Sequence, residues 1–287
     1  MSTNAMTCPV CPHACRLKEG AVGRCRARKH VKDDMGDRII PVNYGIITSL
    51  ALDPIEKKPL NRFYPGSFIL SVGSFGCNLS CPFCQNHEIS SSDGSPFLSD
   101  DNRLDPDELV TLALGTRSKG NIGIAFTYNE PLIGYEYVLD TSRKAKEAGL
   151  KTVVVTAGCI NRPIAWEILP YIDALNIDLK AFRSDTYTGT LGGNLDTVMG
   201  FIEEAVKTSH VELTTLIVPG MNDSDEEMND ICDYILSLEG GYDIPLHISR
   251  FFPRYKMTDR PATDVSKVLH LAELAGARLN HVYPGNI

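Results

Sequence analysis

The stretch SFILSVGSFGCNLSCPFCQN, residues 67–86, joins a short apolar run to a loop that carries three cysteines. An apolar run of this length is typical of a buried β-strand. Cys77, Cys81 and Cys84 follow it within eight positions, in the spacing C-x3-C-x2-C. The stretch therefore predicts a strand that ends in a cysteine-rich loop, and the segments on either side indicate the rest of the fold.

Further apolar runs recur after this strand. They lie at 121–128, 151–157, 173–179, 210–218 and 244–249, and a shorter run lies at 279–284. Segments with helical periodicity separate them, among them 105–120, 134–149, 194–209 and 224–240. Repeated strand–helix units predict a parallel sheet with right-handed crossovers. Six strands are too few for a closed eight-stranded barrel, so we expect an α/β fold: a partial (β/α)6 TIM-like barrel of parallel strands, with 279–284 as a candidate seventh strand.

Residues 1–66 do not follow this alternation. They contain four cysteines, Pro-rich turns and the basic run RCRARKHVK, residues 24–32. We predict that residues 1–66 form an N-terminal cysteine-rich extension, packed against a barrel made by residues 67–287.

Composition limits the function classes. The 287-residue chain is 43% hydrophobic and 22% charged, with a net charge of −8, which argues against nucleic acid or an acidic membrane surface as the main partner. No stretch approaches the ~18 apolar residues that a membrane helix needs. The beginning, MSTNAMTCPV, has neither the basic region nor the apolar run of a signal peptide. We expect a cytoplasmic protein that binds neither nucleic acid nor membrane.

The cysteine loop predicts an iron–sulfur site. Seven of the nine cysteines fall in two clusters, and clusters in a long chain without a signal peptide indicate metal binding rather than disulfides. Three thiolates can hold three corners of a 4Fe–4S cube and leave the fourth iron open to a small molecule. A zinc loop and cysteines without metal are the alternatives, although no second C-x2-C pair follows downstream. Cys159 and Cys232 stand alone and are expected to be buried apolar residues.

Four more cysteines lie in CPVCPHACRLKEGAVGRC, residues 8–25. They are Cys8, Cys11, Cys15 and Cys25, with His13 among them. Their spacing suits a closed tetrahedral zinc site or a second iron–sulfur cluster, and an unmetallated cysteine loop is the alternative. A second cluster could relay electrons, whereas zinc would only stabilise the fold.

The segment GCNLSCPFCQN, residues 76–86, resembles the radical S-adenosylmethionine (SAM) superfamily, most closely the group related to pyruvate formate-lyase activating enzyme. Segments 51–90, 126–131, 176–182, 214–224 and 245–257 resemble the AmmeMemoRadiSam-system radical SAM proteins, so the resemblance covers nearly the whole chain. It implies an oxidoreductase in which a 4Fe–4S cluster cleaves SAM reductively to a 5′-deoxyadenosyl radical, which abstracts hydrogen from an unidentified substrate. It also implies an electron donor such as flavodoxin or ferredoxin, and AMMECR1-like and Memo-like protein partners.

The resemblance also implies a set of cofactor-binding residues. They are Phe83, Gln85, Asn129, Glu130, Asp178, Lys180 and His247. Glu130 ends a predicted strand, where it can accept from the SAM ammonium group or cap the next helix. Asp178 and Lys180 are two positions apart and face the same side, as an ion pair or a ligand site.

The roles of other polar residues in the later strands are not decided by the sequence. Glu212 would bind the substrate or SAM, or it would accept hydrogen bonds within the core. Arg250 is a further candidate, with Phe252 as a packing wall. Thr214 stands near the place where an activating enzyme can carry an arginine, so that substrate contact does not carry over.

Two other functions remain as alternatives. One is a glycyl-radical enzyme activase, whose substrate is a protein glycine. The other is an iron–sulfur or zinc protein that carries electrons or stabilises structure without radical chemistry. The charged residues at the ends of the strands favour an enzyme over the second.

Overall fold

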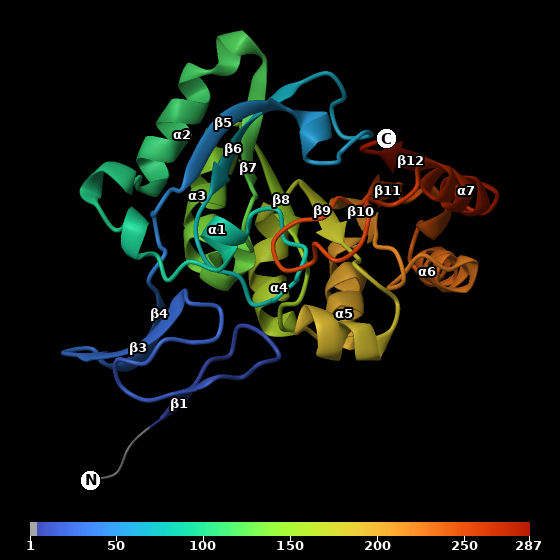
Figure 1. The fold of residues 1–287 in the computed structure, drawn as a ribbon. Coiled ribbons are helices and arrows are strands. Elements are labelled where there is room, and N and C mark those ends of the chain that lie inside the picture. Colours follow the sequence, from blue (N-terminus) through green and yellow to red (C-terminus); the bar gives the residue numbers. More distant parts are fainter. Residues whose placement is uncertain (1–4) are drawn as a thin grey trace.

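The computed structural model describes residues 5–287. Its main sheet has eight strands in the order β12-β11-β10-β9-β8-β7-β6-β5 (Figure 1). Seven are parallel to their neighbours: β6 (Phe68–Gly73), β7 (Asn121–Phe126), β8 (Lys151–Thr156), β9 (Ala174–Asp178), β10 (His210–Ile217), β11 (Leu246–Arg250) and β12 (Val282–Gly285). Each lies beside the strands that precede and follow it in the chain. The predicted partial barrel is confirmed, and segment 279–284 does contribute a seventh parallel strand.

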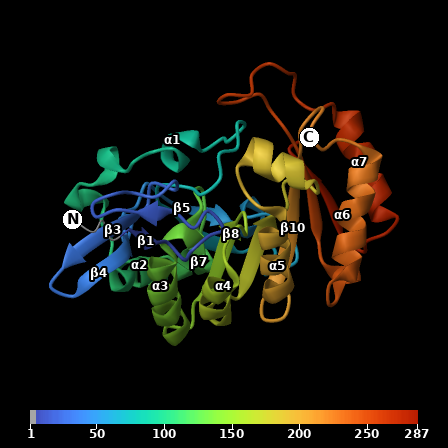
Figure 2. The ribbon, with the colours of Figure 1, turned by 90° about the horizontal axis from the view of Figure 1, so that it is seen from below.

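Helices occupy the crossovers between these strands. They are α1 (His87–Ser90), α2 (Pro106–Gly115), α3 (Tyr135–Glu147), α4 (Arg162–Ile168), α5 (Leu195–Ala205), α6 (Asp225–Ser237) and α7 (Val265–Gly276). Figure 2 shows α3 to α7 in an arc along one face of the sheet. Polar side chains begin several of them as the sequence predicts: Asp105 accepts from the Glu108 N–H, and Ser224 from the Glu227 N–H.

The first residues form a small module and one strand of the main sheet. The module contains β1 (Met6–Thr7), β2 (Arg16–Leu17), β3 (Arg28–Asp33) and β4 (Gly36–Pro41), paired antiparallel in two small sheets. Strand β5 (Ser49–Pro54) pairs antiparallel with β6 and forms an edge of the main sheet. The sequence pattern missed β5 because Asp53 and Pro54 interrupt its short apolar run. The domain boundary at residue 66 stays a prediction, with β5 on its N-terminal side.

Two expectations concern membranes and targeting. Among residues 5–287, no helix has the length and apolar character that crossing a membrane requires. Residues 1–4 begin the stretch on which the expectation of no signal peptide depends, and they lie outside the described residues.

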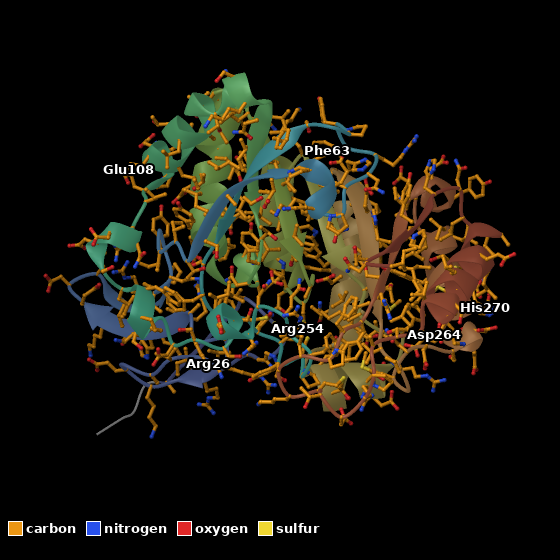
Figure 3. The ribbon with its side chains drawn as sticks, turned by 45° about the horizontal axis from the view of Figure 1, so that its top comes forward. Arg26, Phe63, Glu108, Arg254, Asp264 and His270 are labelled. Carbon is orange, nitrogen blue, oxygen red and sulfur yellow. The ribbon has the colours of Figure 1, made fainter. Side chains whose placement is uncertain are left out.

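The loop between β5 and β6 crosses the amino ends of the parallel strands. Because β5 is antiparallel to β6, this loop lies at the edge where the parallel strands begin. The N–H groups of Asn61 and Arg62 donate to the Glu212 carboxylate at 2.9 and 2.7 Å. The Phe63 ring lies 5.5 Å from the imidazole of His210, between ring centroids. In Figure 3, Phe63 lies in the upper part of the molecule, and Arg26 and Arg254 lie below it.

The contacts between this loop and the parallel strands converge on Glu212. Its carboxylate is fully buried, and it is hydrogen-bonded to the imidazoles of His210 at 2.9 Å and His247 at 2.6 Å. Burial raises its pKa, but these imidazoles and the two backbone N–H groups outweigh burial and lower the pKa to about 2. The structure thus gives Glu212 the hydrogen-bonded core position that the sequence left as one of two alternatives.

Replacing Glu212 with glutamine should destabilise the fold in a pH-dependent way. The amide would place an N–H donor against other donors, at a cost of ~1–3 kcal/mol near neutral pH. The folded-state pKa of Glu212 lies below the ordinary 4.5, so the carboxylate's contribution is complete above that value and is lost as the pH falls toward about 2. Chemical denaturation at several pH values measures this. A stability difference between wild type and Glu212→Gln that persists unchanged at the acid end would contradict the assignment.

Candidate cofactor site at the carboxyl edge of the sheet

The cysteine loop leaves β6 through a tight turn at Gly76. This residue has φ +88°, a conformation that favours glycine. A Cβ atom here would lie 2.5 Å from the carbonyl oxygen of Cys25, so a larger residue would also collide with the N-terminal module. The Gly76 N–H donates to the carbonyl of Ile89 at 3.0 Å. The turn therefore brings the loop against both α1 and the N-terminal module.

Asn129 holds the start of this loop from the end of β7. Its Oδ1 accepts from the Ser74 N–H at 3.1 Å. Its Nδ2 donates to the carbonyls of Phe75 at 3.2 Å and Gly76 at 3.0 Å. These contacts occupy the polar atoms of Asn129 with the backbone of the loop. Its predicted contact with a cofactor stays a prediction, and the structure shows it positioning the loop.

The three thiols are free and packed close together. Burial raises the pKa of Cys77 and the charges of Glu130, Cys81 and Cys84 add to this, while the Leu79 N–H donates to its Sγ at 3.4 Å. Burial also raises the pKa of Cys81, to about 11. Neighbouring buried thiols become thiolates when a metal centre compensates their charge.

The donor set fits an iron–sulfur cluster. Within residues 5–287, no three Cys, His, Asp or Glu side chains converge on a single ion. Ligands of a 4Fe–4S cube need no such convergence, because each thiolate binds a different iron. Three cysteines on one loop can hold three corners of such a cube, whereas a closed zinc site needs a fourth donor.

Glu130 lies beneath this loop and is 2% exposed. Its Oε1 accepts from the Thr156 hydroxyl at 2.7 Å and the Leu132 N–H at 3.1 Å, and its Oε2 accepts from the Ala157 N–H at 2.8 Å. The contact with Leu132 caps the short helix that follows, so the capping role considered for Glu130 is present. Burial nevertheless raises its pKa, because these hydrogen bonds compensate it incompletely.

Asp178 and Lys180 lie together at the end of β9, on the same side as their spacing predicts. The Lys180 ammonium donates to Asp178 Oδ2 at 2.8 Å. Burial lowers the pKa of Lys180, but Asp178 and Cys81 raise it by more, so the ammonium stays charged. In turn, Lys180 opposes the effect of burial on the pKa of Cys81. The cysteine loop therefore has a fixed positive charge beside it.

The aromatic and polar neighbours of the loop differ in their environments. Phe83 is buried, and its ring meets the Phe251 ring edge-on at 6.3 Å. Gln85, in contrast, is exposed, so its predicted cofactor contact has no buried wall to hold it. Phe252 is 44% exposed and lies 4.9 Å beneath the guanidinium of Arg250, which donates to the Thr263 carbonyl at 2.7 Å.

The segment after β11 reaches the cysteine loop, which the sequence did not reveal. The Lys256 N–H donates to the Pro82 carbonyl at 2.9 Å. The Tyr255 ring stacks on His87 of α1, with ring centroids 4.4 Å apart. Figure 1 shows this orange-red segment beside the teal loop and α1. Segment 251–256 therefore contacts both the cysteine loop and α1.

His247 is the second residue of β11, where it pairs with Glu212 and stacks on Tyr283 with ring centroids 5.3 Å apart. Thr214 lies in register with His247 on one side and with Asp178 on the other, and it donates to Asn176 at 3.0 Å. The backbone of His247 is therefore level with Asp178, two strands away, while its imidazole is hydrogen-bonded to Glu212. Its cofactor contact stays a prediction. Cys159 and Cys232 are fully buried, as expected.

Comparison with known proteins identifies the family. The family model described as the radical SAM superfamily matches residues 71–235. An uncharacterized protein of Methanocaldococcus jannaschii is 37% identical over 292 residues, covering 100% of this chain and 83% of that protein. The pyruvate formate-lyase 1-activating enzyme of Escherichia coli K12 is 24% identical over 162 residues, covering 55% of this chain and 65% of that enzyme.

A solved structure agrees with the fold. QueE from Escherichia coli superposes with a TM-score of 0.52 at 11% sequence identity, covering 83% of this chain and 92% of that chain. Radical SAM enzymes use a 4Fe–4S cluster and SAM, and they need an electron donor. Because the family model spans more than half of its length, this chain belongs to the radical SAM superfamily and is a radical SAM enzyme, as its sequence predicts.

Proposed function

We propose that Cys77, Cys81 and Cys84 hold the cluster, and that Glu130, Asp178 and Lys180 form the side of the site that receives SAM. The observation that carries this proposal is the set of three free, neighbouring thiols at the carboxyl edge of the sheet, with Glu130 and Lys180 acting electrostatically on them. When bound by these cysteines, a reduced 4Fe–4S cluster would supply the electron for reductive cleavage of SAM, and the 5′-deoxyadenosyl radical so produced would abstract hydrogen from the substrate.

Two buried glutamates differ in how their charge is compensated. Glu212 has two imidazole partners and two backbone N–H donors, and its pKa is lowered. Glu130 has one hydroxyl and two backbone N–H donors, and its pKa is raised because burial dominates, although Lys180 opposes it. An ammonium group that enters beside Glu130 would gain from this uncompensated charge. This contrast supports Glu130, rather than Glu212, as the partner of the SAM amino group.

The anaerobically reconstituted protein should produce 5′-deoxyadenosine from SAM when dithionite is added. The variant with Cys77→Ala, Cys81→Ala and Cys84→Ala should produce none, because it lacks the proposed ligands. Chromatography of the nucleoside products measures both. Cys232→Ala is the matched control, since it removes a buried thiol from α6 and should retain the wild-type yield.

Two outcomes would overturn this assignment. Equal product from the triple variant would mean that other residues hold the cluster. No product from a wild type with a full cluster would favour the electron-carrying alternative without radical chemistry.

Lys180→Met should make the cluster harder to reduce. The change removes a positive charge beside Cys81 and leaves Asp178 without its partner, and both effects disfavour an added electron. We expect the midpoint potential to fall by an amount on the order of 50–100 mV. A redox titration followed by electron paramagnetic resonance measures it, with Lys180→Arg as the charge-conserving control. An unchanged potential in Lys180→Met would place the ion pair too far from the cluster to act on it.

The electron donor is proposed to be an acidic carrier of the flavodoxin or ferredoxin class. Two segments that contact the cysteine loop, 24–26 and 254–256, each carry two exposed basic residues, although the chain as a whole has a net charge of −8. Arg24 donates to the Ser80 hydroxyl at 3.2 Å, and the Lys256 N–H bonds to Pro82. Arg26 and Arg254 lie on the same side of the molecule (Figure 3). A basic rim of this kind favours encounter with an acidic protein.

The substrate is proposed only as a molecule that gives a hydrogen atom to the radical. Similarity to the E. coli activating enzyme supports a glycyl-radical activase as the second candidate. Thr214 is buried and bonded to Asn176, so the position considered for an activase arginine offers no charged group. AMMECR1-like and Memo-like partners, and a cytoplasmic location, rest on the sequence and its resemblance.

A further inference from the structure

A second group of thiols lies in the N-terminal module. Cys8, Cys11, Cys15 and Cys25 are free, and three of them are buried. A Cβ atom on Gly23, two positions before Cys25, would lie 3.8 Å from the Sγ of Cys15, so the turn that leads to Cys25 packs against this thiol. The backbone turns hold this grouping: the Cys8 N–H donates to the Cys15 carbonyl at 3.0 Å, and the Ala14 N–H donates to the Cys11 carbonyl at 3.1 Å.

These thiols repeat a local feature of the first cysteine loop. There, Cys77 Sγ accepts from the N–H of the residue two positions later. Burial raises the pKa of Cys11 and of Cys25, and backbone N–H groups likewise oppose this effect, that of His13 at Cys11 and those of Ala27 and Arg28 at Cys25. N–H groups close to sulfur favour the thiolate form, which is the form that binds a metal.

The module packs directly against the first cysteine loop. Arg24, the residue before Cys25, donates to the hydroxyl of Ser80 in the first loop at 3.2 Å. The His13 ring lies 2.8 Å from the Asn78 carbonyl oxygen. At Gly76 the missing side chain leaves room for the Cys25 carbonyl. Residues 76–78 thus lie between the two cysteine-containing segments and contact the N-terminal one directly.

We propose that Cys8, Cys11, Cys15 and Cys25 bind a second iron–sulfur cluster beside the first. Four thiolates fill all four corners of a 4Fe–4S cube, so this cluster would have no open iron for SAM. A zinc ion would draw all four sulfurs to ~2.3 Å from one point. The N-terminal thiols belong to a module that contacts residues 76–78 at the start of the first cysteine loop, a position from which a cluster can pass electrons to the first one and a zinc ion cannot.

The test compares metal content and spectra of full-length variants reconstituted anaerobically with iron and sulfide. The wild type should hold about eight irons per chain, and the triple variant Cys77→Ala, Cys81→Ala, Cys84→Ala should retain about four. Cys11→Ala with Cys25→Ala should also retain about four, and Cys232→Ala should match the wild type. After dithionite reduction, SAM should change the paramagnetic resonance spectrum of the Cys11/Cys25 variant and not that of the triple variant.

The spectrum of the reduced wild type should also be broadened by magnetic interaction between the two neighbouring clusters, and each cluster-deficient variant should lose that broadening. A triple variant without iron would overturn the proposal, and so would a wild type with about four irons and one tightly bound zinc. If the Cys11/Cys25 variant does not fold, the triple variant still decides the question. These readouts do not depend on 5′-deoxyadenosine production, so failure of the proposed function would be seen separately.

Discussion

Between Gly76 and the carbonyl of Cys25 there is no room for a single methyl group. This close approach determines how the cysteine loop leaves β6 and how the N-terminal module lies against it. Asn129 then fixes the loop from the neighbouring strand through both ends of its amide. Because these contacts involve backbone atoms of the loop, the thiols of Cys77, Cys81 and Cys84 remain free to act as ligands. The position of both groups of thiols follows from this one contact.

The two edges of the sheet carry buried charges of different kinds. At the amino edge, Glu212 has enough donors to lower its pKa, and the β5–β6 loop covers it. At the carboxyl edge, Glu130 is buried with an incompletely compensated charge, and Lys180 stands beside Cys81. A saturated carboxylate stabilises the fold, whereas an unsaturated one favours a cationic ligand. Glutamate therefore stabilises the fold at one edge, and at the other it would meet the ammonium group of SAM in the proposed site.

Much of this arrangement could be predicted from the sequence. The apolar runs and the Asp and Ser caps predict the strands and helices, and the spacing of the cysteines predicts the loop and its chemistry. Periodicity does not reveal which side chains of neighbouring strands meet, so it could not show that the imidazole of His247 is hydrogen-bonded to Glu212. Nor could it show that Asn129 holds the backbone of the loop, or that Tyr255 reaches α1. Those contacts join segments far apart in the chain, and no local pattern encodes them.

The most direct test of the account is a crystal structure of the protein reconstituted anaerobically with iron and sulfide and bound to SAM. The account predicts a 4Fe–4S cluster ligated by Cys77, Cys81 and Cys84, with the amino group of SAM within hydrogen-bonding distance of Glu130. It also predicts that Asn129 keeps its contacts with the loop. A cluster held by other residues, or a SAM amino group that meets a different carboxylate while Glu130 keeps only its present partners, would contradict it.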